Sequence, residues 1–251
     1  MASNVKILAH RGVSGLYPEN SRIAMEKSVE LAVDGIETDL RITSDGQIVL
    51  MHDAALDRTT DGTGAVIDHT LDQLRQRRLK GPAAAGADCY PDQTVMTLDE
   101  LFDLLKSTSL HLRLEVKEIG FESLLVDRIK QAGLVERTMV SSFIPTVPLA
   151  VKTVDRTIRT ALLTSRFDPA VFEQILPHVD GVDLGVNDAL TADVVRRVRD
   201  HGLAVSFWTI DRVEDFRRAL QFEPDYIMSN IPQRMLKELG RQVPQWADSA
   251  A

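Results

Sequence analysis

Residues 111–142, HLRLEVKEIGFESLLVDRIKQAGLVERTMVSS, carry the pattern that decides the fold. The apolar runs at 111–116 and 138–142 predict two strands, and the stretch at 121–132 between them predicts a helix that ends at Gly133. A strand, a helix and a second strand in this order predict a βαβ unit whose two strands are parallel.

The same alternation continues on both sides of this unit. Downstream, the sequence predicts strands at 158–163, 181–184, 204–208 and 226–229, and helices at 145–154, 169–176, 192–201, 212–220 and 232–239, with Thr191 and Asp211 as helix N-caps. Upstream, it predicts strands at 5–9 and 35–40, a helix at 21–33 capped by Asn20, a hairpin that joins 41–43 to 47–51, and helices at 70–79 and 98–106. About eight strand–helix units in a chain of 251 residues favour an α/β fold, a single (β/α)₈ TIM barrel over residues 1–251, over an open doubly wound sheet.

One stretch interrupts this rhythm. Residues 54–95 hold only one predicted helix and a low-complexity loop at 81–86. A segment of this length within a barrel is usually functional, so the sequence predicts a functional insertion or a lid.

Composition excludes several classes of protein. With 29 Lys and Arg against 37 Asp and Glu, the net charge is −8, which argues against a nucleic-acid binder held by phosphate contacts. The only cysteine, Cys89, cannot form an internal disulfide. No apolar run approaches the roughly 18 residues of a membrane span, and the first residues lack the features of a secretory signal. We therefore expect a cytoplasmic protein, unless a signal segment has been removed. The sequence leaves the oligomeric state open.

Three carboxylates fall on predicted strands of the barrel, where active sites lie at the carboxyl ends. Glu37 and Asp39 are two residues apart and share a face, and Glu115 follows on the next barrel strand. Three carboxylates inside a barrel repel one another unless a cation holds them, and oxygen ligands suit Mg²⁺ or Ca²⁺. Taken singly, Glu115 is equally compatible with a structural ion pair to Lys117, and Glu37 and Asp39 are equally compatible with solvated residues at a strand end.

Positive groups and histidines lie at the same predicted strand ends. Arg11 and Lys117, together with a metal, suit an anion with several oxygens such as a phosphate. His10 and His52 come from different strands. They can therefore stand on opposite sides of that phosphate, one removing a proton from the attacking oxygen and the other protonating the leaving oxygen.

Trp208 ends the predicted strand at 204–208. Its indole face can form the wall of a pocket for the carbon skeleton of a substrate, with the ring N–H available to a hydroxyl group. The alternative is a core tryptophan that fills the barrel.

Several of these residues lie in motifs that resemble the glycerophosphodiester phosphodiesterase family. The motifs are LAHRG (8–12), PENS (18–21), DGIETD (34–39), TSDG (43–46), VLMHD (49–53), LDRTTDGTG (56–64), LEVK (114–117), SSF (141–143) and FWT (207–209). The resemblance covers residues 8–232. It implies a barrel with an insertion after the second strand, and it implies cleavage of glycerophosphodiesters to glycerol phosphate and an alcohol. It also implies roles for the residues singled out above: His10 and His52 as the acid/base pair, Arg11 and Lys117 as phosphate contacts, and Glu37, Asp39 and Glu115 as ligands of one divalent cation.

The sequence departs from the family pattern at two positions. Asp211 follows Trp208-Thr209-Ile210 where the family commonly has Asn, and Ser229-Asn230 ends the last predicted strand where the family commonly has Thr-Asp. Both positions are expected at the rim of the pocket, so the alcohol group of the substrate stays open. Alternatives to the main hypothesis are the same chemistry on a lysophospholipid or a sugar phosphodiester, and a non-catalytic barrel that binds phosphate.

Overall fold

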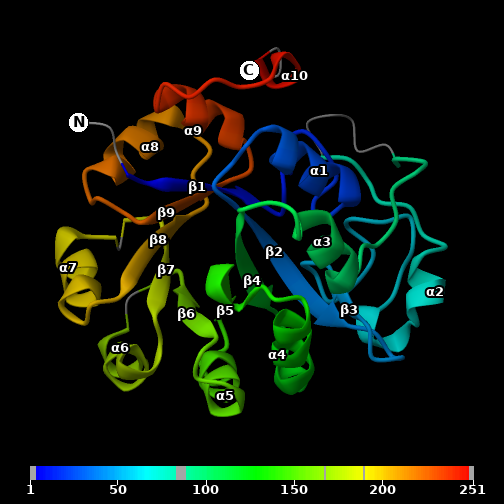
Figure 1. The fold of residues 1–251 in the computed structure, drawn as a ribbon, viewed down its shortest axis with the longest axis horizontal. Helices are drawn as coiled ribbons and strands as arrows, with labels where there is room; N and C mark the ends of the chain where they lie inside the picture. The colour runs from blue at the N-terminus through cyan, green and yellow to red at the C-terminus, as the bar shows by residue number, and fades with distance from the viewer. Residues whose placement is uncertain (1–3, 83–88, 167, 189, 249–251) are drawn as a thin grey trace.

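Eight parallel strands close into a barrel in the computed structural model, which describes residues 4–82, 89–166, 168–188 and 190–248 (Figure 1). The order of neighbours is β1-β9-β8-β7-β6-β5-β4-β2, and pairing of β1 with β2 closes the ring. The bounds are β1 Lys6–His10, β2 Gly35–Ile42, β4 His111–Val116, β5 Thr138–Ser142, β6 Arg159–Thr164, β7 Gly181–Gly185, β8 Ala204–Trp208 and β9 Tyr226–Ser229. The predicted (β/α)₈ barrel is confirmed. A further strand, β3 (Ile48–Leu50), pairs antiparallel with β2 and forms the predicted hairpin.

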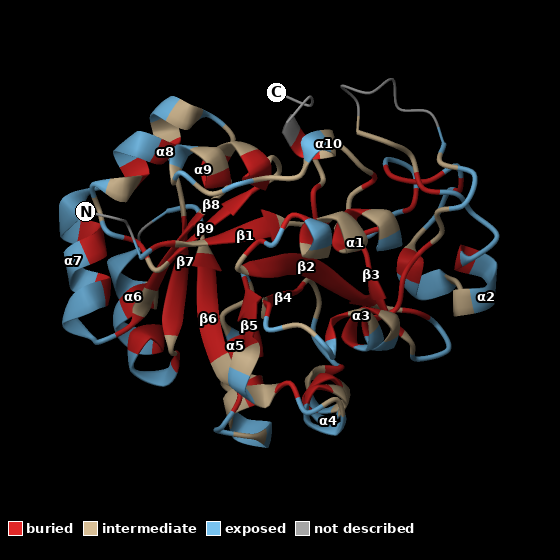
Figure 2. Ribbon diagram, turned by 45° about the horizontal axis from the view of Figure 1, so that its top comes forward, coloured by how far each residue is buried: buried red, intermediate tan, exposed pale blue. Residues whose placement is uncertain are grey.

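Helices follow the strands and cover the outside of the barrel. They are α1 Arg22–Glu30, α3 Leu98–Leu105, α4 Glu122–Gln131, α5 Thr146–Val154, α6 Pro169–Ile175, α7 Ala192–Asp200, α8 Val213–Leu220 and α9 Pro232–Glu238, with the short α10 Gln245–Asp248 near the end of the chain. The strands are buried along most of their length, whereas each helix buries one side and exposes the other (Figure 2). This pattern is typical of parallel strands enclosed by amphipathic helices.

Two local predictions in the first third of the chain were wrong. The predicted helix at 70–79 is a single turn, α2 (Leu71–Leu74), because Leu79 instead pairs with Thr60 and donates its backbone N–H to the carbonyl of Gln93 at 2.9 Å. Asn20 is not the cap of α1, since Ser21 accepts the hydrogen bond from the backbone of Ala24. At Leu79 contacts with distant parts of the chain replace the helix, whereas at α1 the cap moves by one residue, to Ser21.

The described residues of the 54–95 segment pack on a small core of their own, at the side of the barrel beyond β3 (Figure 1). Besides α2 they contain a 3₁₀ turn, Val66–Asp68. The buried apolar side chains of this core are Val49, Met51, Leu56, Val66, Leu74, Leu79 and Val95. Most of the low-complexity loop predicted at 81–86 lies outside the described residues.

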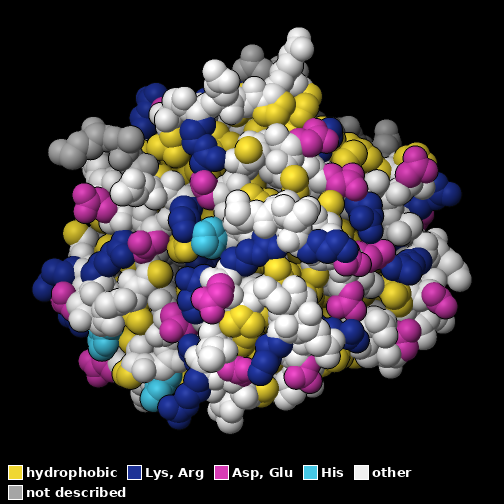
Figure 3. All heavy atoms as spheres, viewed as in Figure 1, with side chains coloured by type: hydrophobic (Ala, Val, Ile, Leu, Met, Phe, Trp, Pro, Cys, Tyr) yellow, Lys and Arg dark blue, Asp and Glu magenta, His cyan; other side chains and the backbone are white. Residues whose placement is uncertain are grey.

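The surface carries mixed charge. On the face shown in Figure 3, Lys and Arg side chains cross the middle with Asp and Glu side chains directly around them, so opposite charges neutralise one another locally. Among the described residues, no helix combines the length and the apolar character needed to cross a membrane.

Candidate active site

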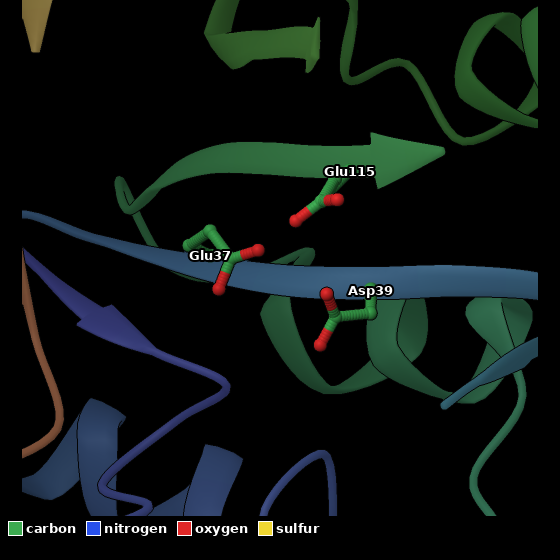
Figure 4. Close-up of side chains that lie close together, drawn as sticks. All are labelled: Glu37, Asp39 and Glu115. Atoms are coloured by element: carbon green, nitrogen blue, oxygen red, sulfur yellow. The ribbon is translucent and has the colours of Figure 1, made fainter. Parts of the chain in front are cut away.

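The three predicted carboxylates meet on two neighbouring strands, β2 and β4. In the register of β2 with β4, Asp39 lies opposite Glu115, and Glu37 is two residues earlier on the same face of β2. Figure 4 shows the three carboxyl groups pointing toward one another, and one ligand atom from each lies within 4.8 Å of the others. All three side chains are buried. The geometry therefore joins the residues that the sequence predicted as a metal site.

The electrostatics of the cluster suit a cation. Burial raises the pKa of Glu37 well above its usual value, and the neighbouring Asp39 and Glu115 raise it further. Burial and Asp39 also raise the pKa of Glu115, to about 7. Burial alone would raise the pKa of Asp39, but Arg11 and Lys117 lower it to about 2. A hard divalent cation such as Mg²⁺ or Ca²⁺ would offset this repulsion, because its positive charge stabilises the ionised form of all three buried carboxylates.

Arg11 and Lys117 border this cluster. The Nε atom of Arg11 lies 3.2 Å from Oδ2 of Asp39, and the Nζ atom of Lys117 lies 2.6 Å from Oε1 of Glu115 and 3.4 Å from Oδ1 of Asp39. Within the described residues, Nε of Arg11 and Oδ1 of Asp39 make these ion-pair contacts without the geometry of a hydrogen bond. Polar atoms that are buried and incompletely satisfied at one point indicate a place for a ligand.

The two predicted histidines are held by their Nδ1 atoms. Nδ1 of His10 lies 2.7 Å from Oδ1 of Asn230, and Nδ1 of His52 lies 2.6 Å from Oδ1 of Asp53. Burial, assisted by Arg11, lowers the pKa of His10 to about 4, and burial also lowers the pKa of His52. Near neutral pH, His10 is therefore uncharged, which is the form of imidazole that accepts a proton.

A cavity of about 60 Å³ brings most of these groups to one place. Six of the eight predicted site residues line it, namely His10, Arg11, Glu37, His52, Glu115 and Trp208. The other two contact lining residues, Asp39 through its ion pair with Arg11 and Lys117 through its ion pair with Glu115. A second cavity of about 550 Å³ also contains His10 and Arg11 in its wall. Residues of the 54–95 segment line the second cavity, and these are Arg58, Thr59, Lys80, Gly81 and Pro82.

Trp208 forms part of the cavity wall together with Phe143. The two rings meet edge to face, with their centres 5.3 Å apart. The indole N–H donates to the carbonyl oxygen of Asp183 at 3.1 Å, so the expectation that this N–H stays available to a substrate hydroxyl is wrong. Trp208 can offer the substrate an apolar surface but no hydrogen bond from its ring nitrogen.

The residues that support the predicted site residues were not themselves predicted from the sequence. Asn20 donates to Oδ2 of Asp39 at 2.8 Å and accepts from the Thr38 hydroxyl, so its side chain turns into the site. Its place in the PENS motif, next to the HRG motif, was the available signal.

Asp211 was predicted to cap α8. The prediction is wrong, because the helix begins after Arg212 without a side-chain cap and the carboxylate of Asp211 binds Asn230 instead.

Comparison with known proteins agrees with this geometry. Residues 10–234 match the Glycerophosphoryl diester phosphodiesterase family. The uncharacterized protein YqiK of Bacillus subtilis is 30% identical over 238 residues, which cover 91% of this chain and 96% of that protein. A glycerophosphodiester phosphodiesterase of Caldanaerobacter subterraneus is 29% identical over 237 residues, which cover 92% of this chain and 96% of that protein.

A solved structure shares the fold. The structure of an Oleispira antarctica phosphodiesterase in complex with the product sn-glycerol-3-phosphate superposes with a TM-score of 0.82 at 24% identity, covering 94% of this chain and 96% of that one. The barrel, the carboxylate cluster and the match over nearly the whole chain lead to one conclusion. The chain belongs to the glycerophosphoryl diester phosphodiesterase family, and it is an enzyme of that family, a phosphodiester hydrolase built on a (β/α)₈ barrel.

Proposed function

We propose that the protein hydrolyses glycerophosphodiesters to glycerol phosphate and an alcohol, with His10 and His52 as the acid/base pair. The observation that carries the proposal is the small cavity, in which both histidines share a wall with Glu37 and Glu115 of the buried carboxylate cluster. A site that only binds phosphate has no need for two histidines beside such a cluster. The relatives named as phosphodiesterases support the same reaction.

The carboxylates of Glu37, Asp39 and Glu115 would hold one divalent cation, Mg²⁺ or Ca²⁺. When bound, such an ion acts as a Lewis acid that polarises the phosphoryl oxygens. Arg11 and Lys117 stand beside these carboxylates. Their positive charges would bind and orient the phosphate of the substrate and stabilise the charge that develops on it.

The two histidines would move the protons. One removes a proton from the attacking oxygen, and the other donates a proton to the oxygen of the departing alcohol. Each ring is held at Nδ1 by a neighbour, Asn230 for His10 and Asp53 for His52, which leaves Nε2 as the atom that can exchange a proton with the substrate. Trp208 and Phe143 would contact the carbon skeleton of glycerol through their ring surfaces.

We also propose that the chain is one barrel domain over residues 1–251 and that the 54–95 segment is a lid that shapes access for the alcohol group. Arg58 and Lys80 of this segment line the larger cavity, which shares His10 and Arg11 with the smaller one. An alcohol group attached to a phosphate beside Arg11 would therefore meet the segment.

The test is a panel of phosphodiesters that differ in the alcohol group and in the presence of glycerol, including a lysophospholipid and a sugar phosphodiester. Each is assayed with Mg²⁺, with Ca²⁺ and with a chelator, and the products are identified. Release of glycerol phosphate that stops with chelator and returns with metal supports the proposal. Binding without turnover on every substrate would instead indicate a phosphate-binding barrel, and preference for a diester without glycerol would replace the proposed substrate.

A further inference from the structure

Asn230, the residue directly after β9, connects His10 to a carboxylate that does not touch the histidine. Its Oδ1 atom lies 2.7 Å from Nδ1 of His10, and its Nδ2 atom donates to Oδ2 of Asp211 at 2.6 Å. The three side chains thus form a line that runs from the carboxylate through the amide to the imidazole.

Asp211 is itself fixed by the backbone and by a neighbouring side chain. Its Oδ1 atom accepts the backbone N–H of Asn230 at 2.8 Å and the hydroxyl of Ser229 at 3.1 Å. With three hydrogen bonds, Asp211 occupies one position and presents one oxygen to the amide of Asn230. Asp211, which does not cap α8, therefore holds the side-chain amide of Asn230 at the end of β9.

The charge on Asp211 determines which way the amide of Asn230 faces. An ionised carboxylate can only accept hydrogen bonds, so the NH₂ group of Asn230 must point toward it and the carbonyl oxygen must point toward His10. The hydroxyl of Ser14 does not fix the amide, because its single proton can go either to the backbone oxygen of His10 at 2.7 Å or to Oδ1 of Asn230 at 2.8 Å.

The direction of the amide in turn determines the tautomer of His10. An amide oxygen can only accept, so the atom that faces it, Nδ1, must carry the ring proton. Nε2 is then left with its lone pair on the side of the ring that faces Glu37, 3.8 Å from Oε2 of that residue, where the small cavity lies. This is the tautomer in which the ring can accept a proton from a group bound in the cavity.

We propose that Asp211 is a positioning residue that acts through Asn230 to hold His10 in the tautomer with the proton on Nδ1. The proposal rests on the proposed function for its catalytic consequence, because His10 matters to turnover only as part of the acid/base pair. The arrangement itself stands on the hydrogen bonds of Asn230.

The variant Asp211→Asn tests the proposal with a change of one atom and one charge. The new amide keeps its oxygen toward the backbone of Asn230 and turns its NH₂ group toward the NH₂ group of Asn230, where two donors oppose each other. We expect the amide of Asn230 to rotate, to present NH₂ to Nδ1 of His10, and to move the ring proton to Nε2. Turnover should then fall by about 10²-fold or more, the scale of one proton-transfer group, with KM little changed.

The double variant Asp211→Asn/Asn230→Asp reverses the order of the pair. The new carboxylate at position 230 accepts both from the new amide at position 211 and from Nδ1–H of His10. We expect the Nδ1–H tautomer to return, and turnover to recover to within about tenfold of the parent. Asp168→Asn is the matched control, since this carboxylate also accepts a backbone N–H, from Ala170, but at the start of α6 and away from His10.

Two readouts separate this proposal from the proposed function. The ¹⁵N chemical shifts of the His10 ring, measured above its pKa, report the tautomer without any substrate, and steady-state kinetics report the catalytic effect. A parent enzyme that turns over no phosphodiester would contradict the proposed function while the tautomer comparison still stands. The positioning role is overturned if Asp211→Asn keeps the proton on Nδ1, or if the double variant shows it on Nε2. If Asp211→Asn does not fold, the tautomer and turnover of the double variant decide the question alone.

Discussion

Arg58 and Glu19 form a two-pronged ion pair, with Nη1 and Nη2 of the guanidinium each 2.8 Å from one carboxylate oxygen. Arg58 belongs to the 54–95 segment, and Glu19 lies in the loop between β1 and α1. On its other side Arg58 binds Asp53, the partner of His52, while Glu19 also binds Arg11 at 3.0 Å. The pair therefore ties the segment to both sides of the site.

Replacing this contact should loosen the segment without unfolding the barrel. Because Arg58 is about half exposed, its ion pairs contribute about 1 kcal/mol or less, and Arg58→Leu should leave the melting temperature nearly unchanged. Hydrogen exchange of the backbone amides at 54–66 should accelerate. Arg58→Lys keeps the charge without the planar fork and should give an intermediate rate. Arg77→Leu, an exposed side chain of the same segment, is the control, and equal exchange in the Arg58→Leu variant and the parent would contradict the prediction.

Removing one carboxylate from the cluster should weaken metal binding. Glu37→Gln, Asp39→Asn and Glu115→Gln each take away a negative oxygen donor, so each should reduce both activity and the rise in melting temperature that Mg²⁺ or Ca²⁺ causes. In metal-free protein near neutral pH, Glu37→Gln should not destabilise the fold. The raised pKa of Glu37 means that its ionised form is unfavourable in the folded state, and the amide avoids that cost.

Asp103→Asn serves as the control for the cluster, because Asp103 is an exposed acid that pairs only weakly with Lys106 at 3.2 Å. It should retain the full metal-induced shift. The assignment of the metal ligands is wrong if all three cluster variants also retain that shift.

The histidines should be needed for turnover and act as a unit. His10→Ala and His52→Ala are each expected to lose about 10²-fold or more in kcat, and the double variant should lose much less than the product of the two effects. His201→Ala, an exposed histidine after α7, should behave like the parent. Near-normal kcat in either single variant would remove that histidine from the mechanism.

Trp208→Ala separates recognition from packing. A tryptophan that fills a core costs about 3–5 kcal/mol of stability when it is replaced by alanine. Trp208 is only partly buried and contacts Phe143 at the cavity wall, so we expect a smaller loss together with weaker discrimination between phosphodiesters with and without glycerol. Trp246→Ala, which removes a ring packed against Tyr17 away from the site, should leave that discrimination intact. A large drop in melting temperature with unchanged substrate ratios would assign Trp208 to packing.

Deleting residues 81–86 tests the lid. Gly81 and Pro82 line the larger cavity, next to Lys80. We expect the ratios of kcat/KM among substrates with alcohol groups of different bulk to change more than kcat on a small test diester does. Lys80→Ala should change the same ratios in a milder way. An identical preference profile for parent and deletion variant would contradict a role of the segment in access.

The barrel could be predicted from sequence because its signals are local and repeated. The strands begin and end within about two residues of their predicted bounds, since each is an apolar run set off by turns and helices. The same logic predicted Glu37, Asp39 and Glu115 as one cluster, because residues two apart on a strand share a face and parallel strands end at the same side of a barrel. These inferences need only the period of the strand and the closure of the ring.

The failures share a different cause. Asn20 and Asp211 stand where helix caps stand, and a short polar side chain satisfies a nearby backbone N–H or a distant partner equally well. Sequence spacing shows only the nearby N–H, whereas in the structure Asp39 and Asn230 are the actual partners. The indole N–H of Trp208 is similar, because its acceptor, the carbonyl of Asp183, is on the neighbouring strand. Hydrogen-bond partners that lie on other segments of the barrel cannot be predicted from the sequence of one segment.

The separate core beneath residues 54–95 has a consequence for how such enzymes diversify. The apolar side chains that stabilise this segment come from the segment itself and from the hairpin at Val49 and Met51, whereas the cluster of carboxylates sits on β2 and β4 within the main core. Substitutions in the segment can therefore accumulate, or the whole segment can be exchanged for another, while the catalytic strands keep their packing. Natural selection, or a protein engineer, could recombine new segments with an unchanged carboxylate cluster, as long as position 58 keeps an arginine that binds Asp53 and Glu19.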